Sequence, residues 1–282
     1  MLITTDFQHR IWVMALDGEL AIAPGHKEAK HVLDMGTGTG IWAMDFADTF
    51  PSAEVVGVDL SPMQPGWTPP NCLFEIDDLE KPWTWSKPFD FIHCRSMDGC
   101  FADPKKIIRK VYDALEPGGW FEVGDVILPV GCDDGTLPED SALRRWHELL
   151  DEAATKMGRR MEGFAKYTAA MEYTGFVDVA CKEYIFPLNS WPKDEKLQMI
   201  GRYMCVNLDI GLEGLSLGLL TRVLGWTKEE VLAFCADVRK DLRNKKIHAY
   251  WRVHRVYARK PEQEAEEEGD DEEEGAGGEP ES

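Results

Sequence analysis

The sequence has no surplus of positive charge. Its 51 acidic residues outnumber its 31 lysines and arginines, which gives a net charge of −20. Residues 261–282 hold 12 of the acids and no lysine or arginine, so the other 260 residues carry only −8. Binding along a nucleic-acid backbone needs a basic face. The composition therefore argues against a nucleic-acid partner, and it predicts a disordered acidic tail at 261–282.

The seven cysteines lack any metal-binding or disulfide pattern. There is no Cys-x-x-Cys pair and no Cys/His cluster at zinc spacing. An odd number of cysteines without a framework is typical of free thiols in a reducing compartment. We expect mostly buried thiols, including Cys94 and Cys100, and no metal site.

Targeting and membrane signals are also missing from the sequence. Asp6 and Arg10 interrupt the first ten residues, so we expect no signal peptide. Charged residues interrupt every long apolar stretch, as Glu213 and Arg222 do around residues 210–220. We expect no membrane partner and a cytoplasmic or nuclear location.

Strand and helix patterns alternate through the first half of the chain. Short β-rich runs are expected at 31–35, 54–60, 72–76, 89–94 and 120–128, and helices at 7–16, 40–50 and 104–116. This alternation predicts an α/β fold with a parallel sheet and right-handed crossovers.

The second half is richer in helix than a sheet needs for its crossovers. Helices are expected at 139–158, 160–173, 193–220 and 227–243, the last one starting with a capping box of Thr227 and Glu230. Strands are expected at 177–186 and 248–259. We expect one domain over 1–260, with a helical cap roughly within 137–245 above the ligand-binding edge of the sheet.

A glycine-rich turn follows the first predicted strand. Asp34 ends the strand, and Gly36, Gly38 and Gly40 precede a helix. Glycines allow a tight turn and close approach to a ligand, and the helix start favours an anion. The spacing is GxGxG rather than the dinucleotide pattern GxGxxG, and no phosphate-binding Lys-Ser/Thr pair follows. An acid inside the turn would repel a pyrophosphate and suits an amine-bearing ligand.

Two further acidic positions follow the next strands. Asp59 ends the second strand, 19 residues after Gly40, where α/β nucleoside sites place an acid on the ribose hydroxyls. Asp77 and Asp78 follow the third strand and suit an adenine amino group. An ordinary ligand-free turn would leave these acids without a common explanation.

With these features the sequence resembles the S-adenosylmethionine-dependent methyltransferases of the Rossmann-like class. The glycine-rich turn, Asp59, Asp77-Asp78 and the turn at 115–120 match their motifs in order and spacing. The segments 74–85, 89–97, 115–123, 211–226 and 238–261 resemble the LaeA-like fungal methyltransferases, over nearly all of residues 7–261. Members of that group usually carry a longer helix before the segment that starts here at Phe7.

The resemblance implies a seven-stranded, mostly parallel Rossmann-like sheet with an antiparallel last strand, and S-adenosyl-L-methionine as cofactor. It implies a cofactor site made of Asp34, Gly36, Thr37, Gly38, Thr39, Gly40, Asp59, Leu60, Asp77, Asp78, His93, Cys94 and Arg95. His93 is the candidate catalytic base, with a structural histidine as the alternative. Arg95 is expected to orient a carboxylate or to pair with Asp98.

Two functions remain open at this stage. The first is an enzyme of secondary metabolism that methylates O, N or S of a small molecule. A set of tryptophans (Trp67, Trp83, Trp85, Trp191, Trp226, Trp251) either lines its acceptor pocket or is core packing. The second is a LaeA-like nuclear regulator that acts through protein partners, with weak or no methyl transfer. The basic residues between Arg239 and Lys246 are then a nuclear signal, or else they are charges that end a helix.

Overall fold

The computed structural model describes residues 2–159, 161 and 164–262. Within them, seven strands form one sheet in the order β3-β2-β1-β4-β5-β7-β6. The strands are β1 (His31–Met35), β2 (Glu54–Asp59), β3 (Cys72–Ile76), β4 (Phe89–Arg95), β5 (Leu115–Gly131), β6 (Val177–Pro187) and β7 (Tyr250–Arg259). The predicted tail lies outside the described residues from 263 onward.

The sheet is mostly parallel. β1 pairs in parallel with β2 and β4, β2 with β3, and β4 with β5. β7 runs antiparallel between β5 and β6. The seven-stranded α/β fold with an antiparallel last strand is thus confirmed. The carboxyl ends of β1 to β4 meet at one edge, where open α/β sheets bind ligands.

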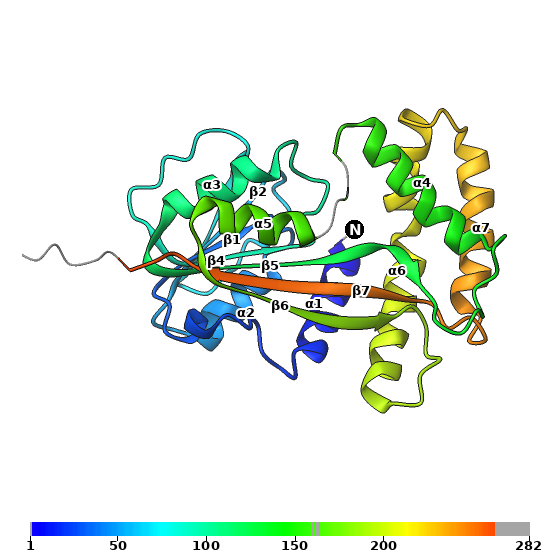
Figure 1. Cartoon of the computed structure of the whole chain (residues 1–282), viewed down its shortest axis with the longest axis horizontal. Helices are drawn as coiled ribbons and strands as arrows, with labels where there is room; N and C mark the ends of the chain where they lie inside the picture. The colour runs from blue at the N-terminus through cyan, green and yellow to red at the C-terminus, as the bar shows by residue number, and fades with distance from the viewer. Residues whose placement is uncertain (1, 160, 162–163, 263–282) are drawn as a thin grey trace, which may run out of the picture.

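Helices cover both faces of this sheet, as Figure 1 shows. The helices are α1 (Leu2–Ala15), α2 (Ile41–Thr49), α3 (Pro104–Ala114), α4 (Ala142–Lys156), α5 (Phe164–Thr174), α6 (Glu195–Arg222) and α7 (Lys228–Arg243), with a short 3-10 helix at Pro24–Lys27. α3 and α5 share a core with one face of the sheet. α2 packs on the other face through Trp42 and Phe46.

The helices α4, α6 and α7 form a group of their own at one end of the sheet (Figure 1). They share a core that includes Trp146, Leu212 and Val238, and α1 joins it through Ile11 and Trp12. The helices expected to form one cap within residues 137–245 therefore belong to two different cores. α5 packs beside α3 instead, because its buried Met171 contacts the core on the sheet face.

The helices α3 and α7 start with side-chain caps, of which the sequence predicted the one at Thr227. Thr227 and Glu230 form the expected capping box at the start of α7. Asp103 accepts hydrogen bonds from the amides of Lys105 and Lys106 at the start of α3, where Pro104 needs no amide partner. Each cap satisfies backbone groups that a helix end leaves open.

One described helix, α6, is long and apolar enough to cross a membrane by length and composition. One of its sides is buried in the core through Met204, Leu208 and Leu212. Core helices of folded domains pass the same test, so α6 is weak evidence for a membrane span.

The expectation of mostly buried thiols is wrong for four of the seven cysteines. Cys72, Cys94 and Cys235 are buried, Cys132 and Cys205 are half-buried, and Cys100 and Cys181 are exposed. Cys100 lies in the loop after β4, and Cys181 lies on the edge strand β6. Neither the loop nor the edge strand is covered on all sides.

Candidate functional site at the glycine-rich loop

The loop between β1 and α2 is built on three glycines in the left-handed region. Gly36, Gly38 and Gly40 have φ of 68°, 58° and 80°, where other residues are strained. A Cβ on Gly36 would lie 2.3 Å from Met97 Sδ, and one on Gly40 would lie 2.2 Å from Phe74 Cζ. These two glycines make room for protein side chains, and Gly36 and Gly38 also line the cavity beside the loop, so the close approach of a ligand stays a prediction.

Asp34 is part of the internal structure of this loop. It is 3% exposed. Thr37 Oγ1 donates to Asp34 Oδ2 at 2.6 Å, and His93 Nδ1 lies 2.8 Å from Asp34 Oδ1. Burial raises the pKa of Asp34 to about 7. Both carboxylate oxygens already have protein partners, and a contact with a ligand ammonium stays a prediction.

His93 is held tightly in the core of the site. Its ring is 1% exposed and stacks on Trp42, with 3.7 Å between ring centroids and 9° between planes. Burial, together with the charges of Arg255 and Arg95, lowers the pKa of His93 well below its usual value. The stack on Trp42 and the contact with Asp34 Oδ1 fix the orientation of the ring. The geometry therefore favours the structural alternative over general-base catalysis.

A cavity of about 160 Å³ opens beside the loop. Its lining consists of Gln8, Asp34, Gly36, Thr37, Gly38, Trp42, His93, Arg95 and Ser96. Sites that enclose a drug-sized ligand measure about 300–1,000 Å³. The cavity therefore has room for one end of a larger ligand, and the rest would lie along the edge of the sheet.

Arg95 is the positive charge of this cavity. Its Nη2 lies 3.3 Å from His9 Nδ1 of α1, and His9 Nε2 in turn lies 2.8 Å from Asp45 Oδ2 of α2. Burial lowers the pKa of Arg95 to about 10, so the guanidinium stays protonated at neutral pH. A partly desolvated cation at the cavity wall is suited to a carboxylate.

Two polar atoms near the cavity have no hydrogen-bond partner in the described part of the chain. They are Ser96 Oγ and His93 Nε2, and both are buried. Ser96 also has a φ of 58°. An unsatisfied buried polar group costs free energy unless a ligand or water supplies the partner. Both atoms belong to residues that line the cavity, as expected of a polar binding site.

The acids after β2 and β3 lie at the same edge of the sheet, since Asp59 pairs with Ile76. Asp59 Oδ2 accepts from the Gly38 amide at 2.9 Å and Oδ1 accepts from the Ser61 amide at 3.0 Å. Leu60 beside it is 70% exposed. Asp77 and Asp78 accept from the backbone amides of Asp78 and Glu80. The edge thus brings acids and exposed apolar surface together.

Several contributors to the site were missed from the sequence. Gln8 reaches the cavity from α1, and Asp6 accepts from Thr39 Oγ1 at 3.2 Å. Gln64 Nε2 donates to the Gly38 carbonyl at 2.7 Å. No local pattern marks these residues, because α1 and the 60–70 loop meet the glycine loop only in three dimensions.

Some predicted residues do not join the site. Cys94 lies between His93 and Arg95 on β4, and successive side chains of a strand point to opposite faces. It is buried in the core shared with α3 and α5. The six tryptophans do not converge either: Trp83 and Trp85 pack against the core that contains β4, whereas Trp226 and Trp251 pack in the core of the helical group.

The basic residues between Arg239 and Lys246 are largely engaged in ion pairs on the helical group. Arg239 contacts Asp209 and Glu213, and Arg243 contacts Asp209. These contacts join α7 to α6, a role that neither sequence-based alternative described.

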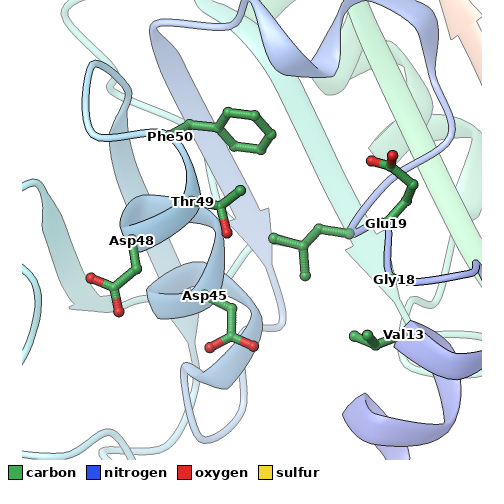
Figure 2. Close-up of a pocket in the computed structure, with 8 residues that line it drawn as sticks. Val13, Gly18, Glu19, Asp45, Asp48, Thr49 and Phe50 are labelled. Atoms are coloured by element: carbon green, nitrogen blue, oxygen red, sulfur yellow. The ribbon is translucent and has the colours of Figure 1, made fainter.

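A larger hollow of about 320 Å³ lies on the other side of α1. Figure 2 shows Thr49 and Phe50, at the end of α2 and just after it, across from Val13 and Glu19, whereas the Asp48 side chain points away from them. Asp45 is the acceptor for His9, so α2 supports the placement of α1. The hollow contains no residue of the glycine loop, and the smaller cavity remains the candidate site.

Comparisons with known proteins agree with this arrangement. Residues 9–180 match the family described as "Methyltransferase domain". "Methyltransferase pytC" of Aspergillus terreus is 40% identical over 257 residues, 91% of this chain and 79% of that protein. "Secondary metabolism regulator LAE1" of Cochliobolus heterostrophus is 38% identical over 265 residues, 92% of this chain and 86% of that protein.

Solved structures share the fold. Coclaurine N-methyltransferase bound to N-methylheliamine and S-adenosylhomocysteine superposes with a TM-score of 0.51 at 15% identity, covering 88% of this chain and 72% of that one. At this identity the likeness concerns the fold alone.

Proposed function

The chain belongs to the methyltransferase family that its residues 9–180 match, and on that premise we propose its reaction. We propose that it transfers the methyl group of S-adenosylmethionine to an O, N or S atom of a small molecule in secondary metabolism. The names of the relatives support this assignment, since one is called a methyltransferase and another a regulator of secondary metabolism.

The cavity fits the amino-acid end of the donor. A free amino acid group carries a carboxylate and an ammonium. Arg95 offers a cation to the carboxylate, and Ser96 Oγ offers a buried hydroxyl that has no other partner in the described chain. His93 Nε2 has no partner in the described chain, and it can accept from the ammonium when Nδ1 carries the ring proton and donates it to Asp34 Oδ1. The polar groups on this wall therefore complement both the carboxylate and the ammonium of an amino acid.

The open edge fits the nucleoside end of the donor. Asp59 is fixed by two backbone amides and keeps acceptor capacity for ribose hydroxyls. Leu60 and Ile76 are 70% and 62% exposed, and they give apolar surface for a flat base. Asp77 and Asp78 lie next to Ile76 and would accept from an exocyclic amino group.

S-adenosylmethionine supplies an electrophilic methyl group when bound. The residues of this chain then have to hold the donor in line with an acceptor and exclude water. Gln8 of α1 closes the cavity over the glycine loop. A base is needed only for an acceptor that is protonated at working pH, and the buried His93 is poorly placed for that task.

The observation that carries this proposal is one cavity at the ends of β1 and β4 whose wall combines the half-buried Arg95 cation with two buried polar atoms that have no partner in the described chain. The test is calorimetric titration of S-adenosylmethionine into the full-length protein and into Asp59→Ala. We expect a Kd of about 1 μM, or about −8 kcal/mol, for the wild type. The variant should bind at least about tenfold more weakly.

Asp237→Ala is the matched control, because Asp237 is an exposed acid of α7 that pairs with Lys240. It should bind the donor like the wild type. A folded wild-type protein that binds no donor would refute the assignment. Acceptors are then screened by mass spectrometry for products heavier by one methyl group.

The regulator remains the second candidate, favoured by the 38% identity to a protein named as a regulator of secondary metabolism. It requires protein partners and a nuclear location. Donor binding without turnover on any small molecule would favour it over the enzyme.

A further inference from the structure

A buried carboxylate outside the cavity holds one of the cavity walls. Asp125 lies on β5 directly after Gly124, which pairs with Arg95 of β4. It is 8% exposed. Its Oδ2 accepts from the Asp98 amide at 2.6 Å, and its Oδ1 accepts from the Val126 amide at 2.8 Å. Asp125 thus binds the loop that follows β4.

This loop needs such an anchor. β4 ends at Arg95, and beyond it only the Ser96 amide continues the pairing, donating to the Gly124 carbonyl at 2.9 Å. Ser96 is in the left-handed region with a φ of 58°, which costs free energy for a residue other than glycine. The hydrogen bond from the Asp98 amide to Asp125 fixes the chain two residues after this strained position.

Burying the carboxylate is costly in itself. Burial raises the pKa of Asp125 to about 7, although hydrogen bonds from the Asp98, Val126 and Met97 amides oppose this rise. A neutral side chain would avoid the cost of desolvation. The presence of an acid at position 125 is therefore explained by the backbone amides that its carboxylate holds in the loop after β4.

The anchored segment contacts the glycine loop. Met97 Sδ fills the space in which Gly36 would carry a side chain, 2.3 Å from the position of that Cβ. Arg95 and Ser96, just before Met97, line the cavity. Asp125 itself does not line it. Its contacts therefore reach the cavity through the segment 95–98.

We propose that Asp125 is a positioning residue for the methyl donor, which holds the segment 95–98 against the glycine loop and so sets the affinity for the amino-acid end. This inference rests on the proposed function. It does not extend to the nucleoside end, whose residues Asp59, Asp77 and Asp78 follow β2 and β3 and accept hydrogen bonds from other backbone amides of the described chain than those that Asp125 holds.

The test is Asp125→Asn in the full-length protein, with two probes. Asparagine keeps the shape but replaces one acceptor oxygen by a donor, which opposes a backbone amide. S-adenosylmethionine should bind about tenfold more weakly, the equivalent of about 1.4 kcal/mol. 5′-Methylthioadenosine lacks the amino-acid end, and its Kd should change by less than about twofold.

Val123→Ala is the control for stability, because Val123 is a buried core residue of the same strand, two positions before Asp125. It should lower the melting temperature and leave both Kd values unchanged. Equal weakening of both probes in Asp125→Asn would mean a merely structural role, and no weakening would also refute the inference. A wild type that binds neither probe would refute the proposed function first.

Met97→Ala is the second variant, in case Asp125→Asn does not fold. It should weaken S-adenosylmethionine and spare 5′-methylthioadenosine in the same way. If Asp125 acts through Met97, the two effects should not add. The double variant should then bind S-adenosylmethionine no more weakly than whichever single variant has the higher Kd. Independent effects of the two changes would contradict the proposed route.

Discussion

At the scale of single residues, the glycine loop combines backbone and packing requirements at the same positions. Gly36 has both a left-handed backbone and a neighbouring sulfur in the place of its absent side chain. These two requirements have separate energetic costs, and substitutions can separate them.

Gly36→Ala should destabilise the protein by about 1–2 kcal/mol from the backbone alone, with an additional cost from the contact with Met97. In a Met97→Ala background only the backbone cost should remain. Urea unfolding of the wild type, the two single variants and the double variant measures the backbone cost and the contact cost. If Gly36→Ala costs nothing once Met97 is shortened, the backbone conformation is not the constraint.

Asp34 predicts an unusual dependence of stability on pH. Its pKa rises from 3.8 to about 7 in the folded protein, so the folded state binds its proton more readily than the unfolded state. The stabilisation that the protonated Asp34 gives to the folded state is fully present below about pH 3.8 and is lost as pH rises through about 7. Asp34→Asn cannot titrate, and it should lose less free energy of unfolding between about pH 5 and 8 than the wild type.

The midpoint of urea unfolding measured across this range checks the prediction. Asp125 has a raised pKa of the same kind and is present in both proteins, so only the difference between them reports on Asp34. A steeper decline in the variant would reverse the assigned direction.

At the scale of elements, α1 connects three parts of the molecule. It packs in the core of the helical group through Ile11 and Trp12. It reaches α2 through the contact between His9 and Asp45, and it reaches β4 through Arg95. It is the element that places Gln8 at the cavity. The affinity for a donor should therefore depend on how firmly α1 is docked.

His9→Ala removes the acceptor for Arg95 and the link to Asp45. It should weaken the binding of S-adenosylmethionine about fivefold, the equivalent of about 1 kcal/mol for one hydrogen bond. Arg10→Ala, an exposed change on the same helix, should bind like the wild type. Calorimetry of both variants checks this, and an unchanged Kd in His9→Ala would show that the docking of α1 does not govern affinity.

At the scale of the whole molecule, the negative charge is concentrated at one end of the sequence. The last residues that the structure describes belong to the fold, since Glu262 contacts Arg259 and lies beside the Cα of Gly118. A C-terminally truncated variant that keeps these contacts should therefore end at Glu262.

Removing residues 263–282 should leave the melting temperature unchanged and keep the Kd for S-adenosylmethionine within about twofold. The site lies in residues 6–98, and α1, which reaches it through Asp6 and Gln8, is retained. Thermal melting and calorimetry check both values. A regulator that uses this segment would instead keep donor binding and lose a protein partner in co-purification.

The sequence by itself determined the parts that depend on near neighbours. The β-rich apolar run of β2, the glycines after Asp34 and the capping box at Thr227 are all set within a few residues. The strand ends then place Asp34, Asp59 and Asp77 at one edge, because parallel strands share their carboxyl edge. The fold and one side of the site follow from these patterns.

Only the tertiary structure decided what closes the site. His9 and Arg95 are 86 residues apart, and the contact between Asp98 and Asp125 spans 27. Such contacts depend on the order of the strands and on the face to which each side chain points, and no local pattern encodes either. For the same reason, no local pattern shows that Cys94 faces the opposite side of the sheet from His93 and Arg95, or that Met97 packs against Gly36.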